Sequence, residues 1–376
     1  MAAVNKVLVI GGGFSGMAAA IQMQRAGIAV DLVEIDPGWC PLGAGITING
    51  ATLRALQTLG VYPGFVDQGW VSDGLDLYSA AGQKLAELPT PRPVGSDVSG
   101  GGAIMRPALA RLLSDATRAS GVAVRTGCSF TTIEQDSDAV TVAFTDGTQG
   151  RYDLVVGADG VHSRLRGLLF PEVPPLGYLG QGVWRAVMPR PAEVVRPRMW
   201  FAQHLKLGVN PVSASHMYMF ITEDRPTKAH IDPATWPAVF HGLMQPFADP
   251  LVQSLQPHAL LPEAAIDYRP LANLLVPTPW NRGRVVMIGD TVAATTPHLA
   301  SGAGIGIESG IVLAEELARH DTLPPALDAF HARRFPRCEM VVRNSERLCR
   351  IEVEGGDKAE HARIMRESMA ALAQPI

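Results

Sequence analysis

The sequence of 376 residues lacks the features that mark secreted, membrane-spanning and nucleic-acid-binding proteins. Its four cysteines lie far apart and form no CxxC pair, which argues against a disulfide framework and a zinc site. No apolar run approaches the ~18 residues that suggest a membrane-spanning helix. Basic residues number 32 and acidic residues 36, so the net charge of −4 offers no basic surface for nucleic acid. We therefore expect a soluble cytoplasmic protein without a bound metal ion.

The N-terminal segment contains the parts of a dinucleotide-binding unit in the required order. Lys6 to Ile10 is a short apolar run, and Gly11, Gly13 and Gly16 follow it in GxGxxG spacing. A run of helix formers and a second apolar strand lead to Glu34, about 20 residues further on. The glycines permit a tight turn, close approach of a pyrophosphate and close helix packing, in that order. Glu34 suits an adenosine ribose without a 2′-phosphate, which favours FAD or NAD(H) over NADPH at this site.

The segments that follow favour FAD as the bound dinucleotide. A second glycine-rich loop, Pro41 to Ile46, contains Gly45, and no second βαβ repeat comes after it. Arg106 opens a predicted helix with proline in its first turn, where it either contacts the cofactor or is a solvated residue. Two further apolar strands run into Asp159 and Asp290, each next to a glycine. Three such strand ends at one edge of a parallel sheet would form the crevice that a long dinucleotide needs.

The rest of the chain predicts antiparallel strands followed by helices. Residues 122–144 alternate apolar and polar side chains as in a β-meander, and residues 177–275 contain strands with one buried face. The chain after Gly310 has helical periodicity. We therefore expect a mixed α/β fold with a Rossmann-like FAD-binding domain, an interleaved antiparallel-sheet substrate domain and C-terminal helices. The predicted boundaries are 1–176 and 276–320 for the discontinuous FAD-binding domain, 177–275 for the substrate domain and 321–376 for the C-terminal helices.

Together these motifs resemble the single-component, FAD-dependent aromatic hydroxylases, the group of para-hydroxybenzoate hydroxylase and salicylate hydroxylase. The match rests on the GxGxxG unit up to Glu34, the "DG" motif in GADGVHSRLR and the "GD" motif in RVVMIGD, across nearly the whole chain. The resemblance implies that NADH or NADPH reduces FAD and that O2 adds at flavin C4a. The resulting hydroperoxide would hydroxylate an aromatic or heteroaromatic small molecule. Dimers occur in this family, and the sequence does not decide whether this chain forms a homodimer.

The resemblance also implies roles for residues of the cofactor site. Asp290 would contact the FAD ribityl chain, Arg106 would contact FAD, and Asp159 would serve both FAD and the nicotinamide donor. Pro297 would lie beside the isoalloxazine, and the helix that begins at Gly302 would direct its N–H groups at the negative charge of reduced flavin. The full set of expected cofactor-binding residues is Gly11, Gly13, Phe14, Ser15, Gly16, Glu34, Ile35, Gly45, Arg106, Asp159, Asp290, Pro297, Gly302, Ala303 and Gly304.

Candidates for catalysis come from the predicted sheet and from the segment after Asp290. Family members often have a histidine or arginine five positions before the proline that ends a strand, and this position is Lys206 when counted from Pro211. Lys206 is otherwise a surface lysine or the ion-pair partner of Asp290. His204 would lie on the same strand face two residues earlier, or else is a solvated edge residue. The catalytic candidates are Lys206, His204, Tyr218, His298 and Pro297.

One position departs from the family pattern. Members usually read GDAAH after the "GD" strand, whereas this chain has Ala293 in place of the histidine. We therefore expect the flavin-holding parts to be present and the local packing near the flavin to differ.

The substrate is less well defined than the cofactor. Trp184, Arg185 and the run Met217 to Phe220 either line the substrate pocket or belong to the core. Aromatic or heteroaromatic hydroxylation is the leading hypothesis. The same scaffold could perform epoxidation, Baeyer–Villiger insertion or oxidative decarboxylation, and a third hypothesis is a non-catalytic FAD-binding redox protein.

Overall fold

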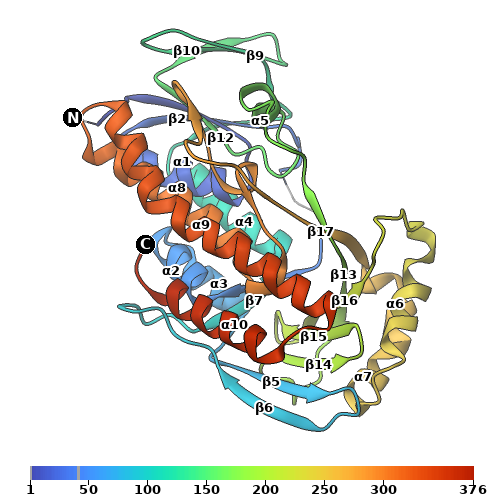
Figure 1. Cartoon of the computed structure of the whole chain (residues 1–376). Coiled ribbons are helices and arrows are strands. Elements are labelled where there is room, and N and C mark those ends of the chain that lie inside the picture. The colour runs from blue at the N-terminus through green and yellow to red at the C-terminus, as the bar shows by residue number, and fades with distance from the viewer. Residues whose placement is uncertain (1, 40–42) are drawn as a thin grey trace.

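A computed structural model describes residues 2–39 and 43–376, and a six-stranded sheet forms the part that the sequence predicts to bind a dinucleotide (Figure 1). The strand order is β18-β19-β12-β1-β2-β8, and all neighbours are parallel except β18 and β19. The three strands that the sequence predicted to converge, β1, β12 and β19, are adjacent. The bounds are β1 Lys6–Ile10, β2 Ala29–Glu34, β8 Ala123–Thr126, β12 Leu154–Gly157, β18 Asn281–Arg282 and β19 Val285–Met287.

An eight-stranded sheet lies beside it, with the order β20-β17-β13-β16-β15-β14-β5-β6. All its neighbours are antiparallel except β14 and β5. The bounds are β5 Gly74–Ser79, β6 Lys84–Pro89, β13 Gly177–Pro189, β14 Arg198–Ala202, β15 Leu205–Pro211, β16 His216–Asp224, β17 Asp267–Leu275 and β20 Ala293–Ala294. Residues 74–89 thus belong to this sheet, although the sequence assigned them to the FAD-binding part. The pairing of β5 with β14 joins segments that are far apart in the sequence, so it leaves no local signal.

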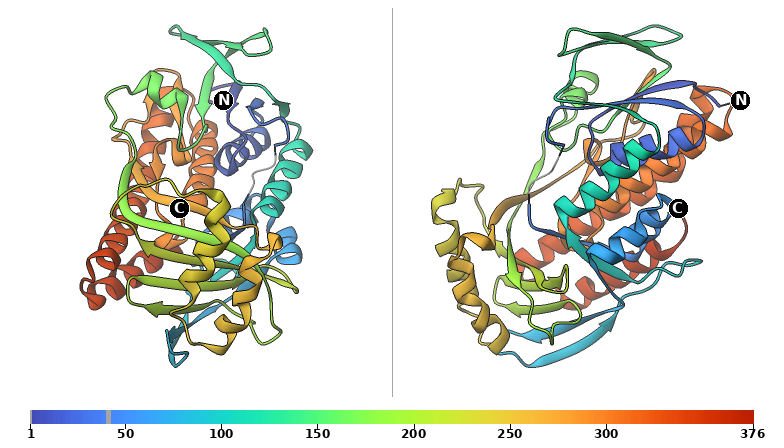
Figure 2. Two further views of the ribbon diagram at one scale, coloured as in Figure 1. Left: turned by 90° about the vertical axis from the view of Figure 1, so that its right-hand side faces the viewer. Right: turned by 180° about the vertical axis from the view of Figure 1, so that it is seen from behind.

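The two faces of the eight-stranded sheet pack against different parts of the chain. Helices α6 (Trp236–Met244) and α7 (Pro250–Leu255) cover the outer face, where Trp184, Leu207 and Met219 join the core (Figure 2). The opposite face, which carries Val187, Tyr218 and Phe220 and which we call the inner face, packs against residues of the N-terminal part such as Ala44 and Ala103.

Two three-stranded sheets complete the strands of the described chain. One has the order β3-β7-β4, and the other, β11-β10-β9, is an antiparallel meander. The prediction of a meander over 122–144 is wrong at its start, because β8 pairs in parallel with β2 instead. Alternating side chains do not distinguish an edge strand of a parallel sheet from a meander strand. The bounds are β3 Gly45–Asn49, β4 Trp70–Ser72, β7 Gly101–Met105, β9 Phe130–Gln135, β10 Val140–Phe144 and β11 Gln149–Tyr152.

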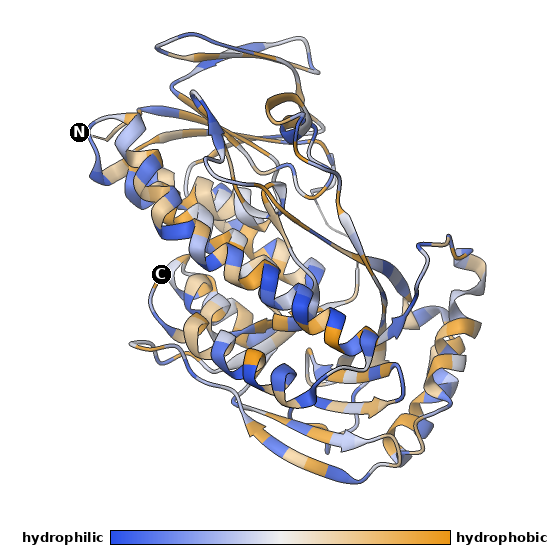
Figure 3. Ribbon diagram, in the orientation of Figure 1, coloured by the Kyte–Doolittle hydropathy of each residue, from blue (hydrophilic) through white to orange (hydrophobic). Residues whose placement is uncertain are grey.

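The helices pack mainly against the six-stranded sheet and against one another. Helices α1 and α8 lie in close contact, since a Cβ at Gly310 would lie only 2.6 Å from the backbone nitrogen of Ala19. The expected C-terminal helices are α9 and α10, which mix hydrophilic and hydrophobic residues as helices with one buried face do (Figure 3). The bounds are α1 Phe14–Arg25, α2 Gly50–Thr58, α3 Tyr62–Gln68, α4 Arg106–Ala119, α5 Arg164–Leu169, α8 Gly302–Arg319, α9 Leu323–Glu354 and α10 Lys358–Ala373. Every helix in the described ranges is too short or too polar to cross a lipid bilayer.

Candidate functional site

The glycine-rich turn between β1 and α1 has the geometry of a phosphate cradle. Gly11 has φ +105°, and a side chain there would overlap the carbonyl oxygen of Ala158. A side chain at Gly16 would overlap the carbonyl oxygen of Gly11. A Cβ at Gly13, by contrast, would meet no heavy atom within 4 Å, so the space before the helix N-terminus is open. The first N–H groups of α1 have no partner within the helix and suit the phosphates of a dinucleotide.

Glu34 lies next to this turn at the end of β2. Its carboxylate accepts hydrogen bonds from the backbone N–H of Gly12 at 2.6 Å and of Asp36 at 2.8 Å. The indole of Trp39 donates to the carbonyl oxygen of Gly12 at 2.7 Å, so two side chains fix the turn. The neighbouring Ile35 is 73% exposed. Sequence reasoning missed Trp39, because a tryptophan in an irregular loop belongs to no motif. Pro41 and Leu42 of the second glycine-rich loop lie outside the described residues.

Arg106 and Asp290 come from distant segments and interact electrostatically. Arg106 is the first residue of α4, as predicted, and its guanidinium lies 5.2 Å from the ring centre of Phe14. Asp290 lies in the turn after β19, and both charged side chains are exposed to solvent. The protein around the Asp290 carboxyl nevertheless raises its pKa to about 6, and the charge of Arg106 opposes this rise. The two residues therefore place complementary charge beside the phosphate cradle.

The "DG" and "GD" motifs are joined to each other by hydrogen bonds. The hydroxyl of Thr291 accepts from the backbone N–H of Gly160 at 3.1 Å, and Arg166 donates to the carbonyl oxygen of Thr291 at 2.9 Å. Asp159 accepts from the backbone N–H of Leu165 at 3.1 Å, at the start of α5. The bonds of Thr291 with Gly160 and Arg166 therefore hold the two motifs together at the edge of the sheet.

The N-terminus of α8 lies beside β3 and α2. A side chain at Gly304 would overlap the hydroxyl of Thr52, so this glycine permits the close approach of the two helices. Asn49 donates to the hydroxyl of Ser301 at 2.8 Å and also caps α2 by accepting from the backbone N–H of Thr52 at 3.0 Å. Ser15 of α1 is in contact with Gly306 of α8. The first residues of α8, including Ala303 and Gly302, are thereby held in one position relative to the cradle.

The two residues at the turn before α8 point in different directions. Pro297 is exposed, whereas the side chain of His298 is only 2% exposed. The Nδ1 atom of His298 lies 2.9 Å from the hydroxyl of Thr296, and its Nε2 atom lies 3.4 Å from a carboxylate oxygen of Glu352. Burial lowers the pKa of His298 despite the negative charge of Glu352. His298 therefore belongs to a buried polar cluster.

Glu352, near the end of α9, is the centre of that cluster. Its carboxylate accepts from Lys206 at 2.6 Å and from Gln181 at 3.3 Å, and lies 3.2 Å from Nε2 of His361. Burial opposes ionisation of Glu352, yet Lys206 and His298 hold its pKa well below the usual range. Lys206 is thus paired with Glu352, and the alternative that it pairs with Asp290 is wrong. Sequence reasoning missed Glu352, because no motif marks a single acid within a 32-residue helix.

His204 and Tyr218 occupy different environments. His204 has φ +59° and lies in the turn before β15, so the expectation that it shares a strand face with Lys206 is wrong. Its side chain is 55% exposed and lies 2.6 Å from Asp224, as the edge-residue alternative requires. Tyr218 lies on the inner face, where Gly45 leaves room for its ring. Its ring centre is 5.9 Å from that of Phe220, and the two form an aromatic wall between the sheets.

Ala293, the position that departs from the family pattern, is a small and buried residue. It pairs with Leu275 in the short contact between β20 and β17 and is 1% exposed. Its methyl group belongs to the main hydrophobic core. The presence of Ala293 in place of the family's histidine therefore affects packing of the hydrophobic core.

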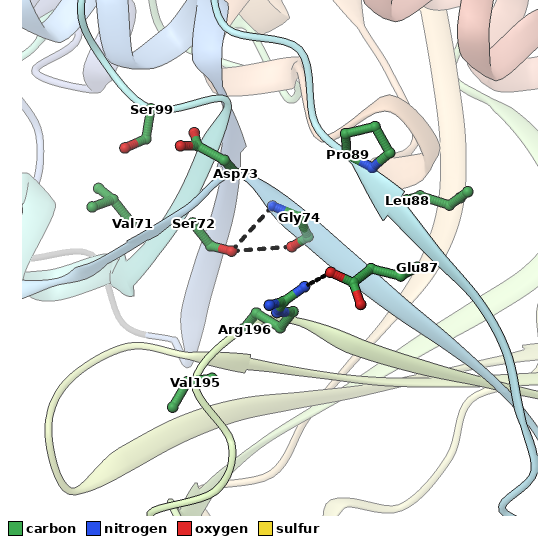
Figure 4. A pocket seen from close by; sticks show the side chains of 10 residues that line it. All are labelled: Val71, Ser72, Asp73, Gly74, Glu87, Leu88, Pro89, Ser99, Val195 and Arg196. Carbon is green, nitrogen blue, oxygen red and sulfur yellow. Dashed lines mark hydrogen bonds and ion pairs between the residues drawn. The ribbon is translucent and has the colours of Figure 1, made fainter.

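A cavity of about 720 Å³ lies elsewhere on the molecule, between β4, β5, β6 and the segment before β14 (Figure 4). An ion pair between Arg196 and Glu87 crosses it. Its described lining residues are all different from the predicted site residues, so this cavity is separate from the cofactor cradle.

Comparison with known proteins agrees with a site for a dinucleotide such as FAD. A family model described as an FAD binding domain matches residues 5–345. The chain is 31% identical over 319 residues to the 2-heptyl-3-hydroxy-4(1H)-quinolone synthase of Pseudomonas aeruginosa, which covers 82% of this chain and 79% of that protein. It is 28% identical to the aurachin C monooxygenase/isomerase of Stigmatella aurantiaca, over 92% of this chain and 89% of that one.

A similar solved structure is that of Klebsiella pneumoniae HpxO complexed with FAD and uric acid. Its TM-score to this chain is 0.82 at 24% identity, with 98% of this chain and 92% of that chain covered. The expected mixed α/β fold is therefore confirmed.

Proposed function

Because this chain belongs to the family of the FAD binding domain and is an FAD-dependent monooxygenase, we propose that it hydroxylates a heteroaromatic small molecule with O2 and NADH or NADPH. The redox chemistry is supplied by the bound FAD. One similar protein is named a quinolone synthase, and HpxO was crystallised with uric acid, and both of these heteroaromatic compounds support the substrate class. The observation that carries the proposal is the convergence of an open cradle at Gly13, the Arg106–Asp290 charges and the aromatic wall at Tyr218.

The proposed cofactor site uses residues of several distant segments. The cradle at Gly11 to Gly16 and the N-terminus of α1 would hold the pyrophosphate, and Glu34 would accept from the ribose hydroxyls. Asp290 and Arg106 would bind the polar chain between the pyrophosphate and the flavin. The N-terminus of α8 would stabilise negative charge that develops on the flavin during reduction. Exposure of Arg106 and Asp290 supports this assignment, because both side chains are free to accept a ligand.

The proposed substrate site lies between the inner face and the cofactor. Tyr218 and Phe220 would orient an aromatic ring and exclude water from the reacting atoms. Lys206 and His298 would act as positioning residues, because both are held by Glu352 and not directed at open space. We also propose the domain division that the sequence predicted, with residues 74–89 added to the substrate domain because they form β5 and β6 of its sheet.

Substrate-dependent oxygenation by the purified protein tests this function. The holoenzyme would be mixed with NADH or NADPH and with phenols, aromatic acids, hydroxypyridines and quinolones, while nicotinamide oxidation and product mass are recorded. We expect at least one compound to stimulate oxidation and to gain one oxygen atom on its ring. Product masses distinguish hydroxylation from decarboxylation. Bound FAD without stimulation by any compound would instead support the non-catalytic alternative.

A further inference from the structure

Thr47 lies in the middle of β3, on the strand face that is turned toward the aromatic wall. Its partner in the register of β3 and β7 is Ala103, which packs with Tyr218. The residues on either side of Thr47, Ile46 and Ile48, pack with the main hydrophobic core instead. Side chains alternate along a strand, so Thr47 has the face opposite to that core.

Two neighbours on this face connect Thr47 to the two parts of the proposed site. Two residues before it, Gly45 lies so close to Tyr218 that a Cβ at Gly45 would be only 2.4 Å from the Cβ of Tyr218. Two residues after it, Asn49 donates to the hydroxyl of Ser301, the residue before α8, at 2.8 Å. Residues two apart on a strand share a face, so Thr47 lies between the aromatic wall and the helix that would face the flavin.

The hydroxyl oxygen of Thr47 is buried and has no hydrogen-bond partner in residues 2–39 and 43–376. Six other side-chain polar atoms of the described ranges share this condition, but they lie in β5, β14, α9 or the Glu352 cluster. An unpaired buried hydroxyl costs free energy, and valine has nearly the same shape without that cost. The hydroxyl at this position therefore suits a ligand that supplies the missing partner.

The chemistry of a threonine hydroxyl fits a neutral ring nitrogen. The side chain of Thr47 is partly exposed although its oxygen is buried, and rotation about χ1 exchanges the positions of the oxygen and the methyl group. A hydroxyl both donates and accepts, so it can pair with the N–H of a quinolone-like ring or the lone pair of a pyridine-like ring. A carbocyclic ring in the same place would leave the hydroxyl unpaired and would bind more weakly.

We propose that the hydroxyl of Thr47 forms a hydrogen bond with a ring nitrogen of the substrate, and that the substrate is a nitrogen heteroaromatic compound in preference to a carbocyclic one. This inference rests on the proposed function, since it narrows the substrate class of the same site. The ring nitrogens of a bound flavin have the same ligand chemistry, so the test separates the two sources.

The test compares ligands with and without a ring nitrogen, and it does not depend on turnover. A quinolone with the matching naphthol, and a hydroxypyridine with phenol, would be titrated into the FAD-loaded enzyme while the flavin absorbance spectrum is followed. Variants Thr47→Val and Thr47→Ser would be compared with Thr141→Val, which makes the same change on β10 of the meander. FAD affinity would be measured by flavin fluorescence, and Tm by calorimetry.

We expect Thr47→Val to weaken binding of the nitrogen compounds by about 3-fold to 10-fold, as the loss of a neutral hydrogen bond does. Binding of naphthol, phenol and FAD would change little, Thr47→Ser would retain most of the affinity, and Thr141→Val would behave as wild type. The Tm of Thr47→Val should not fall, because the hydroxyl has no partner in the described protein to lose.

Several results would overturn the proposal. They are failure of every nitrogen compound to bind, an equal loss of nitrogen and carbocyclic ligands from Thr47→Val, a selective loss of FAD, or a clear fall in Tm. If nitrogen compounds bind through Thr47 and none is oxygenated, this inference stands and the proposed function fails. Oxygenation of a compound whose binding is insensitive to Thr47→Val gives the reverse.

Discussion

Replacing Glu352 by glutamine should destabilise the fold, because it removes one charge from a largely buried ion pair. The Lys206 and Glu352 side chains are 14% and 18% exposed, and their charged atoms lie 2.6 Å apart. Loss of one partner of a buried pair costs about 3–5 kcal/mol, and the lower end applies here because an amide oxygen still accepts from Lys206. For a chain of this size we expect Tm to fall by roughly 5 °C.

Thermal unfolding of four proteins measures this coupling: wild type, Glu352→Gln, Lys206→Met and the double variant. The double variant should be more stable than the sum of the single losses predicts, by about 2 kcal/mol, because no charge is then left unpaired. Glu339→Gln is the matched control on the same helix; its pair with Arg343 is exposed and should contribute less than about 1 kcal/mol. Strict additivity of the two single variants would refute the assignment of Glu352 as the partner of Lys206.

The same cluster predicts how stability depends on pH. Glu352 has a pKa below its usual 4.5, so its contribution is present above that value and is lost as pH falls through the folded pKa. His298 has a pKa below its usual 6.5, so protonation of the unfolded chain starts to favour unfolding as pH falls below that value. We therefore expect the contribution of this cluster to stability to decline on acidification below about 6.5, whereas protonation of Asp290, whose pKa is raised to about 6, acts in the opposite direction. Denaturant titrations at several pH values should show a smaller acid loss below about 4.5 for Glu352→Gln than for the wild type.

Three further substitutions have distinct expected outcomes. Gly13→Ala should fold normally but bind FAD more weakly, because its methyl group enters the open space of the cradle. Gly16→Ala should lower Tm, because its methyl group overlaps the backbone of Gly11. Calorimetry measures Tm and flavin fluorescence measures FAD binding, so the two assays distinguish these variants. Asp290→Asn should stabilise the apoprotein at pH 7, since the raised pKa of this carboxyl means that folding opposes its ionisation, and should weaken FAD binding. His204→Ala should leave substrate affinity nearly unchanged, because this exposed residue lies in a turn, and a large loss of activity would contradict that position.

The cofactor part of the fold could be predicted from sequence because its determinants are local. Gly11, Gly13 and Gly16 follow a short buried strand, and the acids Asp159 and Asp290 follow two others, so periodicity and spacing were enough. Strands β1, β12 and β19 are adjacent, as the shared edge required.

The remaining features depend on contacts between distant segments. Sequence periodicity placed Lys206 on a strand, yet its partner Glu352 lies 146 residues away, and no local pattern connects them. The turn at His204 depends on a positive φ that its neighbours in the sequence do not indicate.

Incorporation of oxygen from isotopically labelled O2 tests the central claim most directly. The FAD-loaded enzyme, a nicotinamide donor and a compound that stimulates its oxidation would be incubated under labelled O2, and the product analysed by mass spectrometry. The account predicts a ring-hydroxylated product that carries one labelled oxygen atom. Nicotinamide oxidation that yields only hydrogen peroxide with every compound, or a product oxygen that comes from water, would contradict it.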